Sequence, residues 1–148
     1  MATGFGVGKV GFAPGTFGTL LGVPVYLVLM QAAAGVYLLA LALLLAFAVW
    51  VCGIAERGLP HDDASIVLDE IVGYLITMYA APVGWVWVIA GFLWFRLFDI
   101  WKPFPIGRID RSLPGGFGTV LDDAAAGVYA WAGLQATALL IGAPTLVP

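Results

Sequence analysis

The chain has 148 residues, of which 62% are hydrophobic and only 10% are charged, and its mean hydropathy is +1.03. A soluble domain carries about a quarter charged residues, so this composition excludes an ordinary water-soluble globule and favours a chain surrounded by lipid. The net charge of −3, without a basic tract, excludes most nucleic-acid-binding classes. The length predicts a single domain over residues 1–148.

Five apolar segments follow one another along the chain. A membrane-spanning helix needs about 20 apolar residues, and the second segment, which has no charged residue, fits this length best. Pro82 and Gly84 end the third segment, because proline does not continue a helix. The pattern predicts an all-α fold, a polytopic membrane helix bundle with about five helical segments. We place these segments at Thr16–Met30, Val36–Ile54, Ser65–Ala81, Trp85–Phe98 and Gly118–Ile141.

The charged residues are confined to three regions, which are the N-terminal arm, residues 56–70 and residues 96–123. The connections at 31–35 and 81–84 carry no charge, and neither does the stretch after Asp123. In an up-and-down bundle the three charged regions share one side. All six basic residues lie there, so the positive-inside bias assigns this side to the cytoplasm.

Two pairs of adjacent acids stand where apolar segments begin. Asp69–Glu70 opens the third segment and Asp122–Asp123 opens the fifth. An acid within the bilayer costs about 2.5–3.5 kcal/mol on insertion scales, and acids that converge also repel one another. Mg²⁺ relieves both costs because carboxylate oxygens are its natural ligands, so we predict that Asp69, Glu70, Asp122 and Asp123 bind Mg²⁺. Helix capping is the alternative, and it is the favoured interpretation for Asp62–Asp63.

Basic residues are interleaved with acids near the end of the fourth segment. Arg96 and Asp99 are spaced i, i+3, as are Asp99 and Lys102, so each pair shares a helix face. Lys102, with Arg108 and Arg111 in the following Pro- and Gly-containing connection, suits the binding of a phosphate group. A structural ladder of salt bridges explains the i, i+3 spacings equally well. Arg108 and Arg111 are explained equally well as solvated loop residues that follow the positive-inside bias.

The segment Ala13–Thr19 is a glycine-rich entry into a helix and contains the hydroxyls of Thr16 and Thr19. Free N–H groups at a helix start bind anions, so both threonines are candidate phosphate ligands. A plain turn with an N-cap is the alternative, and the same two interpretations apply to Gly115–Gly118. The single histidine, His61, is more simply explained as polar surface than as a general acid or base.

Several phosphatase chemistries are excluded because their motifs are absent. Cys52 and Arg57 are separated by four residues, whereas a cysteine phosphatase loop needs five, and a phosphohistidine mechanism of the membrane type needs two histidines. The sequence has no Asp-x-Asp, no Walker A loop and no His-Glu-x-x-His zinc site. What remains is carboxylate-bound Mg²⁺ acting on a phosphorylated lipid.

These residues lie in blocks that resemble the phosphatidylglycerophosphatase A family. The blocks cover most of the chain in order, at Ala13–Thr19, Ser65–Gly73, Phe95–Ile106, Asp110–Arg111, Gly115–Asp123 and Ala126–Gly127. The resemblance implies hydrolysis of phosphatidylglycerol phosphate to phosphatidylglycerol and phosphate, with Mg²⁺, at the bacterial inner membrane. It also implies that the site includes Asp69, Glu70, Asp99, Asp122 and Asp123.

Our hypothesis for the mechanism assigns catalytic roles to Asp99, Asp69 and Asp123, with Asp99 orienting or deprotonating the attacking water or joining the metal ligands. The expected phosphate ligands are Thr16, Thr19, Arg96, Lys102 and Arg111. The acyl chains of the phospholipid substrate would lie among the apolar helices, and a homo-oligomer is compatible with this arrangement. The alternative is a small non-enzymatic membrane protein that uses the acids as a cation site or path. The absence of charge from the central and distal parts of every segment favours an active site at the cytoplasmic interface.

Overall fold

The computed structural model describes residues 14–55, 67–108 and 116–144, and within these ranges it contains helices and turns but no strand. The helices are α1 (Pro14–Leu29), α2 (Ala34–Ala55), α3 (Leu68–Thr77), α4 (Trp85–Trp101) and α6 (Gly116–Leu140), and residues 106–108 are also helical. The predicted all-α class is therefore confirmed for the described residues. The predictions for His61, Asp62–Asp63, Ser65 and Arg111 lie outside the described residues.

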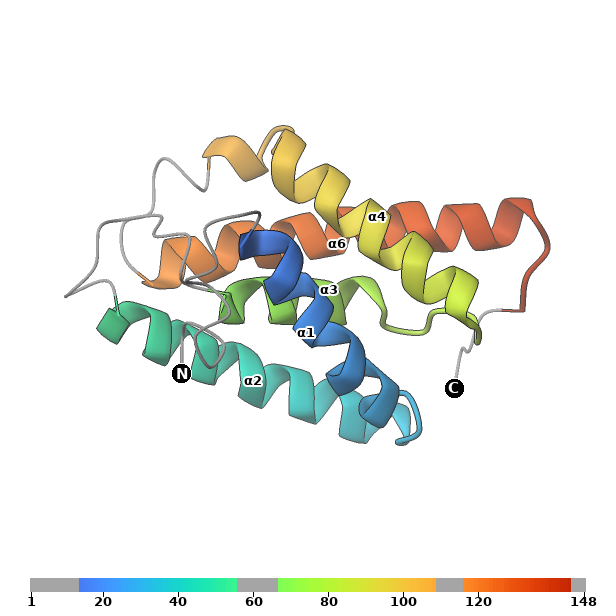
Figure 1. Cartoon of the computed structure of the whole chain (residues 1–148), viewed down its shortest axis with the longest axis horizontal. Coiled ribbons are helices and arrows are strands. Elements are labelled where there is room, and N and C mark those ends of the chain that lie inside the picture. The colour runs from blue at the N-terminus through green and yellow to red at the C-terminus, as the bar shows by residue number, and fades with distance from the viewer. Residues whose placement is uncertain (1–13, 56–66, 109–115, 145–148) are drawn as a thin grey trace.

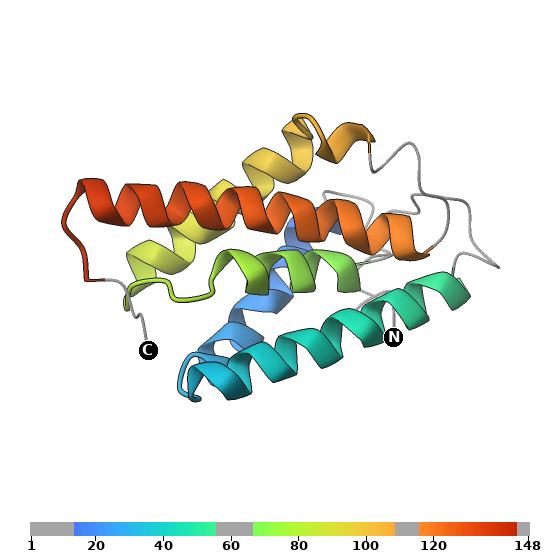
Figure 2. The ribbon, with the colours of Figure 1, turned by 180° about the vertical axis from the view of Figure 1, so that it is seen from behind.

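The helices run alternately up and down (Figures 1 and 2). The turns at 30–33 and 78–84 lie at one end of the bundle, together with the end of α6. The first turns of α3 and α6 and the last turns of α2 and α4 lie at the opposite end. We call this the charged end, because all charged residues of the described ranges lie toward it: Asp69, Glu70, Arg96, Asp99, Lys102, Arg108, Asp122 and Asp123.

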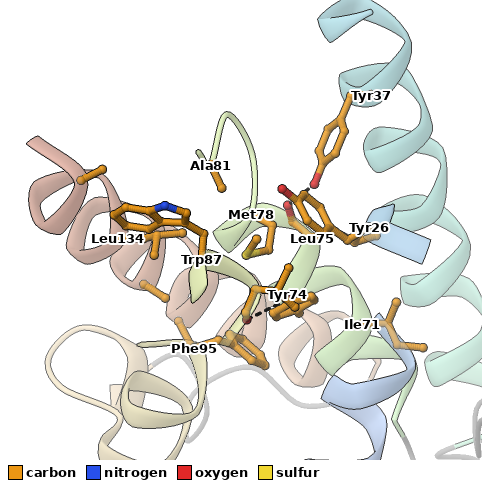
Figure 3. Packing of buried hydrophobic residues seen from close by; sticks show 14 of the residues in the cluster. Tyr26, Tyr37, Ile71, Tyr74, Leu75, Met78, Ala81, Trp87, Phe95 and Leu134 are labelled. Atoms are coloured by element: carbon orange, nitrogen blue, oxygen red, sulfur yellow. Dashed lines mark hydrogen bonds between the residues drawn. The ribbon is translucent and has the colours of Figure 1, made fainter. Parts of the chain in front are cut away.

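Helix α3 is the central element and packs against α1, α2, α4 and α6. Its side chains Tyr74 and Leu75 are fully buried, and they pack in one cluster with Phe95 and Leu134 (Figure 3). The Tyr74 hydroxyl donates a hydrogen bond to the carbonyl of Val88 (3.2 Å). Buried aromatic residues of this kind supply much apolar contact area while their polar atoms remain bonded, so the core holds α3 firmly.

The outer surface of the bundle is also apolar. On α4, large side chains are exposed along one face, including Trp85, Val86, Ile89, Leu93 and Ile100. Among the described helices, α2 alone is long and apolar enough to cross a membrane, over the stretch Ala34–Val51. Only 11% of this stretch is buried inside the protein. Contiguous exposed apolar surface of this extent is rare in soluble monomers and indicates contact with lipid or with another protein.

Helix α3 is shorter than the sequence predicts. The sequence analysis ends the third segment at Ala81, whereas the helix ends at Thr77, and its 10 residues are about 15 Å long against a hydrocarbon core of about 30 Å. Ala80 has a φ of 55°, so the chain turns there in the left-handed region. The turn is stabilised from α6, because Trp131 Nε1 donates to the Tyr79 carbonyl (3.0 Å) and Gln135 Nε2 donates to the Tyr79 and Ala80 carbonyls (3.2 Å each).

Candidate active site

Five carboxylates from three helices converge at the charged end. Three of them are buried, since Asp69 is 5% exposed, Asp122 4% and Asp123 5%. Asp123 is close enough to the other four acids for their charges to act on it. The predicted meeting of the two acidic pairs, with Asp99 beside them, is therefore found in the structure. The side chains that form this acidic cluster are Asp69, Glu70, Asp99, Asp122 and Asp123.

The local sequence explains where Asp69 and Glu70 point. They occupy the first turn of α3, which begins at Leu68, whereas the sequence analysis places the start of this segment further back at Ser65. Acids in a first turn are stabilised by the free N–H groups and the dipole of the helix. Asp69 Oδ1 accepts a hydrogen bond from the backbone N–H of Glu70 (3.0 Å). Asp69 and Glu70 are therefore stabilised by the start of their helix and also belong to the acidic cluster, so the two interpretations do not exclude each other.

Two basic side chains meet the cluster. Arg96 Nη1 lies 2.5 Å from Asp99 Oδ2 and 3.7 Å from Glu70 Oε1, which confirms the predicted i, i+3 pair and extends it to α3. Lys102 Nζ lies 2.6 Å from Asp122 Oδ2. Lys102 follows the last residue of α4 in the left-handed conformation (φ 44°, ψ 58°). Its side chain therefore no longer follows the helix, and it contacts α6 instead.

The acids outnumber their basic partners. Within the described residues, Arg96 pairs with Glu70 and Asp99, Lys102 pairs with Asp122, and Glu70 Oε2 is buried without a hydrogen-bond partner. Burial raises the pKa of Glu70 to about 8, although Arg96 opposes this shift. Burial also raises the pKa of Asp69 well above its usual range, with the charge of Glu70 adding to the effect. Buried carboxylates with raised pKa values are typical of functional sites.

The donor chemistry of the cluster suits a hard cation. Its available ligands are carboxylate oxygens, which Mg²⁺ prefers, and both the surplus negative charge and the unpartnered Glu70 Oε2 fit a positive ion. In residues 14–55, 67–108 and 116–144, however, no three acidic, histidine or cysteine side chains are grouped closely enough to hold a metal ion as they stand. The residues predicted to hold one are Asp69, Glu70, Asp122 and Asp123, and their binding of Mg²⁺ stays a prediction.

The predicted phosphate ligands have different surroundings. Thr16 is partly exposed, whereas Thr19 is fully buried, which favours a structural role for its side chain. The exposed Arg108 lies with its guanidinium 5.1 Å from the centre of the Phe104 ring. Arg111 lies outside the described residues. Their roles as phosphate ligands stay predictions.

Gly18 on α1 is a site residue that the sequence analysis missed. A Cβ added there would overlap Glu70 Oε2 and would lie 2.7 Å from Val67 Cβ. Only glycine therefore allows the Glu70 carboxylate to lie against α1. The glycine-rich pattern at 13–19 was visible, but nothing in it indicates which neighbour requires the space.

A cavity of about 200 Å³ lies at the other end of the bundle. It is lined by apolar and tyrosine side chains such as Tyr26, Met30, Tyr37 and Tyr79, and no acidic or basic side chain lines it. It therefore belongs to a different region from the acidic cluster, which is where the ionisable groups gather.

Comparison with known proteins identifies a family and several relatives that are similar to this chain. Residues 1–138 match the model of the family described as Phosphatidylglycerophosphatase A. The chain is 40% identical over 130 residues to "Phosphatidylglycerophosphatase A" of Escherichia coli (strain K12), covering 86% of this chain and 76% of that protein. It is 41% identical over 134 residues to the protein of the same name from Haemophilus influenzae, covering 88% and 82%.

A third relative has a different name. The chain is 37% identical over 150 residues to a "Putative phosphatidylinositol-3-phosphatase" of Bacteroides thetaiotaomicron, covering 96% of this chain and 94% of that protein. No solved structure matches the chain. The match of the family model over nearly the whole chain, with the two relatives that carry the family's name, shows that the chain belongs to the phosphatidylglycerophosphatase A family.

Proposed function

We propose that the chain is a membrane-embedded, Mg²⁺-dependent phosphatase that hydrolyses phosphatidylglycerol phosphate to phosphatidylglycerol and phosphate. The observation that carries this proposal is the acidic cluster, which gathers five carboxylates and two basic side chains at one end of an otherwise apolar bundle. A phospholipid has the complementary distribution, with apolar tails and a charged phosphate at one end. Membership of the family supports the same substrate.

Each charged residue has a role in this proposal. Asp69, Glu70, Asp122 and Asp123 would hold Mg²⁺, which when bound neutralises phosphate charge and lowers the pKa of a bound water. Asp99 orients the attacking water and accepts its proton, and Arg96 holds the Asp99 carboxylate in place at 2.5 Å. The water oxygen bonds to phosphorus, the bond from phosphorus to the glycerol oxygen breaks, and the glycerol oxygen takes up a proton.

Of the two described basic side chains that pair with the acids, Lys102 is the better placed to meet the phosphate. Its side chain is 31% exposed, whereas that of its partner Asp122 is 5% exposed. The ammonium group is therefore the more accessible member of the pair. Arg96 is less exposed, at 18%, and already pairs with both Glu70 and Asp99. We therefore assign it first to positioning these two carboxylates and only second to binding phosphate.

The proposal places the charged end at the cytoplasmic face, with several helices crossing the membrane. The long apolar stretch of α2, the exposed apolar face of α4 and the position of all basic residues support it. Single cysteines at Gln31 and Arg108, both exposed and at opposite ends, provide a test in a Cys52→Ser background. A membrane-impermeant maleimide added to intact spheroplasts should label Gln31→Cys and should label Arg108→Cys only after permeabilisation. The reverse pattern would contradict the orientation.

Phosphate release by the purified protein in detergent tests the function itself. We expect release from phosphatidylglycerol phosphate with Mg²⁺, and loss of release with EDTA or in the Asp122→Asn, Asp123→Asn double variant. Phosphatidylinositol 3-phosphate should be assayed in parallel, because the name of the Bacteroides relative concerns that type of lipid. No release from phosphatidylglycerol phosphate, together with Mg²⁺ flux in liposomes, would favour the non-enzymatic cation path instead.

A further inference from the structure

The backbones of α3 and α6 touch at Gly73 and Gly127. A Cβ added at Gly127 would overlap the carbonyl oxygen of Gly73 and would lie 3.1 Å from its Cα. A Cβ added at Gly73 would overlap the ring of Phe95 and would lie 2.7 Å from the backbone oxygen of Asp123. Because the obstacles at Gly127 are backbone atoms, a side chain there is accommodated only if the two helices move apart.

A hydroxyl group links the two glycines. Thr77 is fully buried, and its Oγ1 lies 3.0 Å from the carbonyl oxygen of Gly73 and 3.3 Å from that of Gly127. The single hydroxyl hydrogen of Thr77 is therefore shared between one carbonyl of α3 and one of α6. A polar link of this kind in an apolar core defines one separation of the helices more narrowly than apolar contacts do.

The glycine contact lies one helical turn from the acids. Asp69 precedes Gly73 by four residues and Asp123 precedes Gly127 by four, so each acid shares a helix face with its glycine. Both acids are 5% exposed, and the charge of Asp69 acts on Asp123. The distance between the two helices at the glycines therefore governs the distance between the two carboxylates.

We propose that the Gly73–Gly127 contact, with Thr77, sets the separation of the two helix backbones from which Asp69 and Asp123 reach a divalent cation. The inference rests on the proposed function, and it makes these three residues positioning residues. Mg²⁺ demands near-octahedral geometry with ligands at about 2.0–2.1 Å, so a helix displacement on the order of 1 Å is large on this scale. A change in the separation of the two helices would weaken binding of the ion, because the two carboxylates would no longer reach it together.

The test compares Gly127→Ala with Gly133→Ala in the full-length protein. Gly133 lies on the same helix, and a Cβ there would be 2.9 Å from the Trp94 ring of α4, so this variant also disturbs packing but leaves the α3–α6 contact alone. Mn²⁺ affinity is measured in detergent by the electron paramagnetic resonance signal of the free ion, together with thermal melting. We expect at least a tenfold loss of Mn²⁺ affinity in Gly127→Ala and less than a twofold loss in Gly133→Ala, whatever their melting temperatures.

A longer acid provides a rescue. In the Gly127→Ala background, Asp123→Glu adds one methylene and should recover part of the lost Mn²⁺ affinity, whereas Asp123→Glu alone should reduce it. A merely structural role for Gly127 predicts no such recovery. Equal Mn²⁺ affinities in Gly127→Ala and Gly133→Ala would overturn the inference while leaving the proposed function intact.

A milder pair of variants keeps the test decisive if Gly127→Ala does not fold. Thr77→Val removes the shared hydroxyl at nearly constant volume, and Thr137→Val removes an equivalent hydroxyl that bonds within α6 alone, to Gly133 (2.8 Å). We expect a threefold to tenfold loss of Mn²⁺ affinity in the first and none in the second. Absence of Mn²⁺ binding by the unmodified protein would refute the metal site itself, and this inference with it.

Discussion

The ammonium nitrogen of Lys102 lies 2.6 Å from Asp122 Oδ2, and this ion pair joins the end of α4 to the second turn of α6. It forms because the backbone of Lys102 leaves the helical conformation at φ 44° while its N–H still donates to the Phe98 carbonyl (2.9 Å). A non-glycine residue in this region carries backbone strain, which is found preferentially at functional sites. The strained residue here carries a charged group of the proposed active site.

Lys102→Met should destabilise the metal-free protein, because the buried Asp122 carboxylate would lose its ion pair with Lys102. The Lys102→Met, Asp122→Asn double variant should recover much of the loss, giving a coupling energy of about 0.5–3 kcal/mol in a double-mutant cycle. Unfolding in detergent with EDTA present measures it. A Lys102→Met variant that unfolds like the unmodified protein would show that the pair contributes nothing.

Asp122→Asn and Asp123→Asn should each lower turnover at least tenfold while the helical circular dichroism spectrum stays unchanged. Each substitution keeps the volume of the side chain and removes a buried negative charge that the proposed Mg²⁺ needs. Gln31→Ala is the control, because Gln31 is exposed at the opposite end of the bundle and its amide bonds only within its own turn, to Leu27 (2.8 Å). Turnover within twofold of normal in Asp123→Asn would remove this residue from the site.

The affinity for Mg²⁺ should rise with pH between about pH 6 and pH 8. The pKa of Glu70 is raised to about 8 in the metal-free protein, so at pH 6 its proton must leave before the carboxylate can bind a cation. Isothermal titration at pH 6, 7 and 8 in buffers of different ionisation enthalpy measures both the affinity and the protons released. Glu70→Gln should weaken binding and flatten its dependence on pH.

The metal-free protein should lose stability as pH rises. Because the folded-state pKa of Glu70 lies above its model value of 4.5, the folded state binds more protons than the unfolded state between about pH 4.5 and 8. Stability is therefore complete below this range and declines through it, and Asp69, whose pKa is also raised, contributes with the same sign. Melting temperatures with EDTA at pH 5 and pH 8 test this, and Glu70→Gln should narrow the difference.

Gly18→Ala should impair Mn²⁺ binding and turnover more than Gly22→Ala does. Both glycines lie on α1 and face α3, but a Cβ at position 18 would overlap Glu70 Oε2, whereas one at position 22 would lie 2.8 Å from the Tyr74 ring. The two variants thus disturb the same helix pair, one at the acids and one a turn away. Adding Glu70→Asp to Gly18→Ala shortens the acid and should restore part of the binding; equal losses in both alanine variants would contradict this role of Gly18.

Leu43→Arg should reduce membrane insertion. Leu43 is 64% exposed and lies in the middle of the apolar stretch of α2, where an arginine costs about 2.5–3.5 kcal/mol on insertion scales. The fraction of protein that resists alkaline extraction from membranes measures the effect, and Leu43→Phe is the matched control. If this face of α2 contacted water, arginine would be tolerated and the protein would become more soluble.

Local patterns in the sequence predicted the features that depend on one helix. The i, i+3 spacing was enough to pair Arg96 with Asp99, and uninterrupted apolar composition was enough to place α2. Adjacent acids at the start of two apolar segments indicated that both pairs belong to one site, because each pair is costly alone. The structure brings these pairs together, and their roles in binding Mg²⁺ stay predictions.

The features that the sequence analysis missed depend on contacts between helices. The partner of Lys102 on α6 could not be predicted, since it follows from a left-handed residue at the end of α4. Likewise, Gly73 and Gly127 were visible only as members of blocks that resemble the family, because close contact of two backbones has no signature in either helix alone. The early end of α3 has the same origin, in side chains more than fifty residues away along the chain.

The hydrogen bonds from Trp131 and Gln135 to the turn after α3 have a consequence for the acids at the other end of that helix. A helix that stops inside a hydrocarbon layer would leave carbonyls without water, and here indole and amide donors take the place of solvent. In the proposed membrane arrangement, the level of Asp69 and Glu70 along the membrane normal would thus be set by the anchored end of a short helix, about 15 Å away. Two neutral side chains at that end would therefore govern the depth of the proposed hydrolysis.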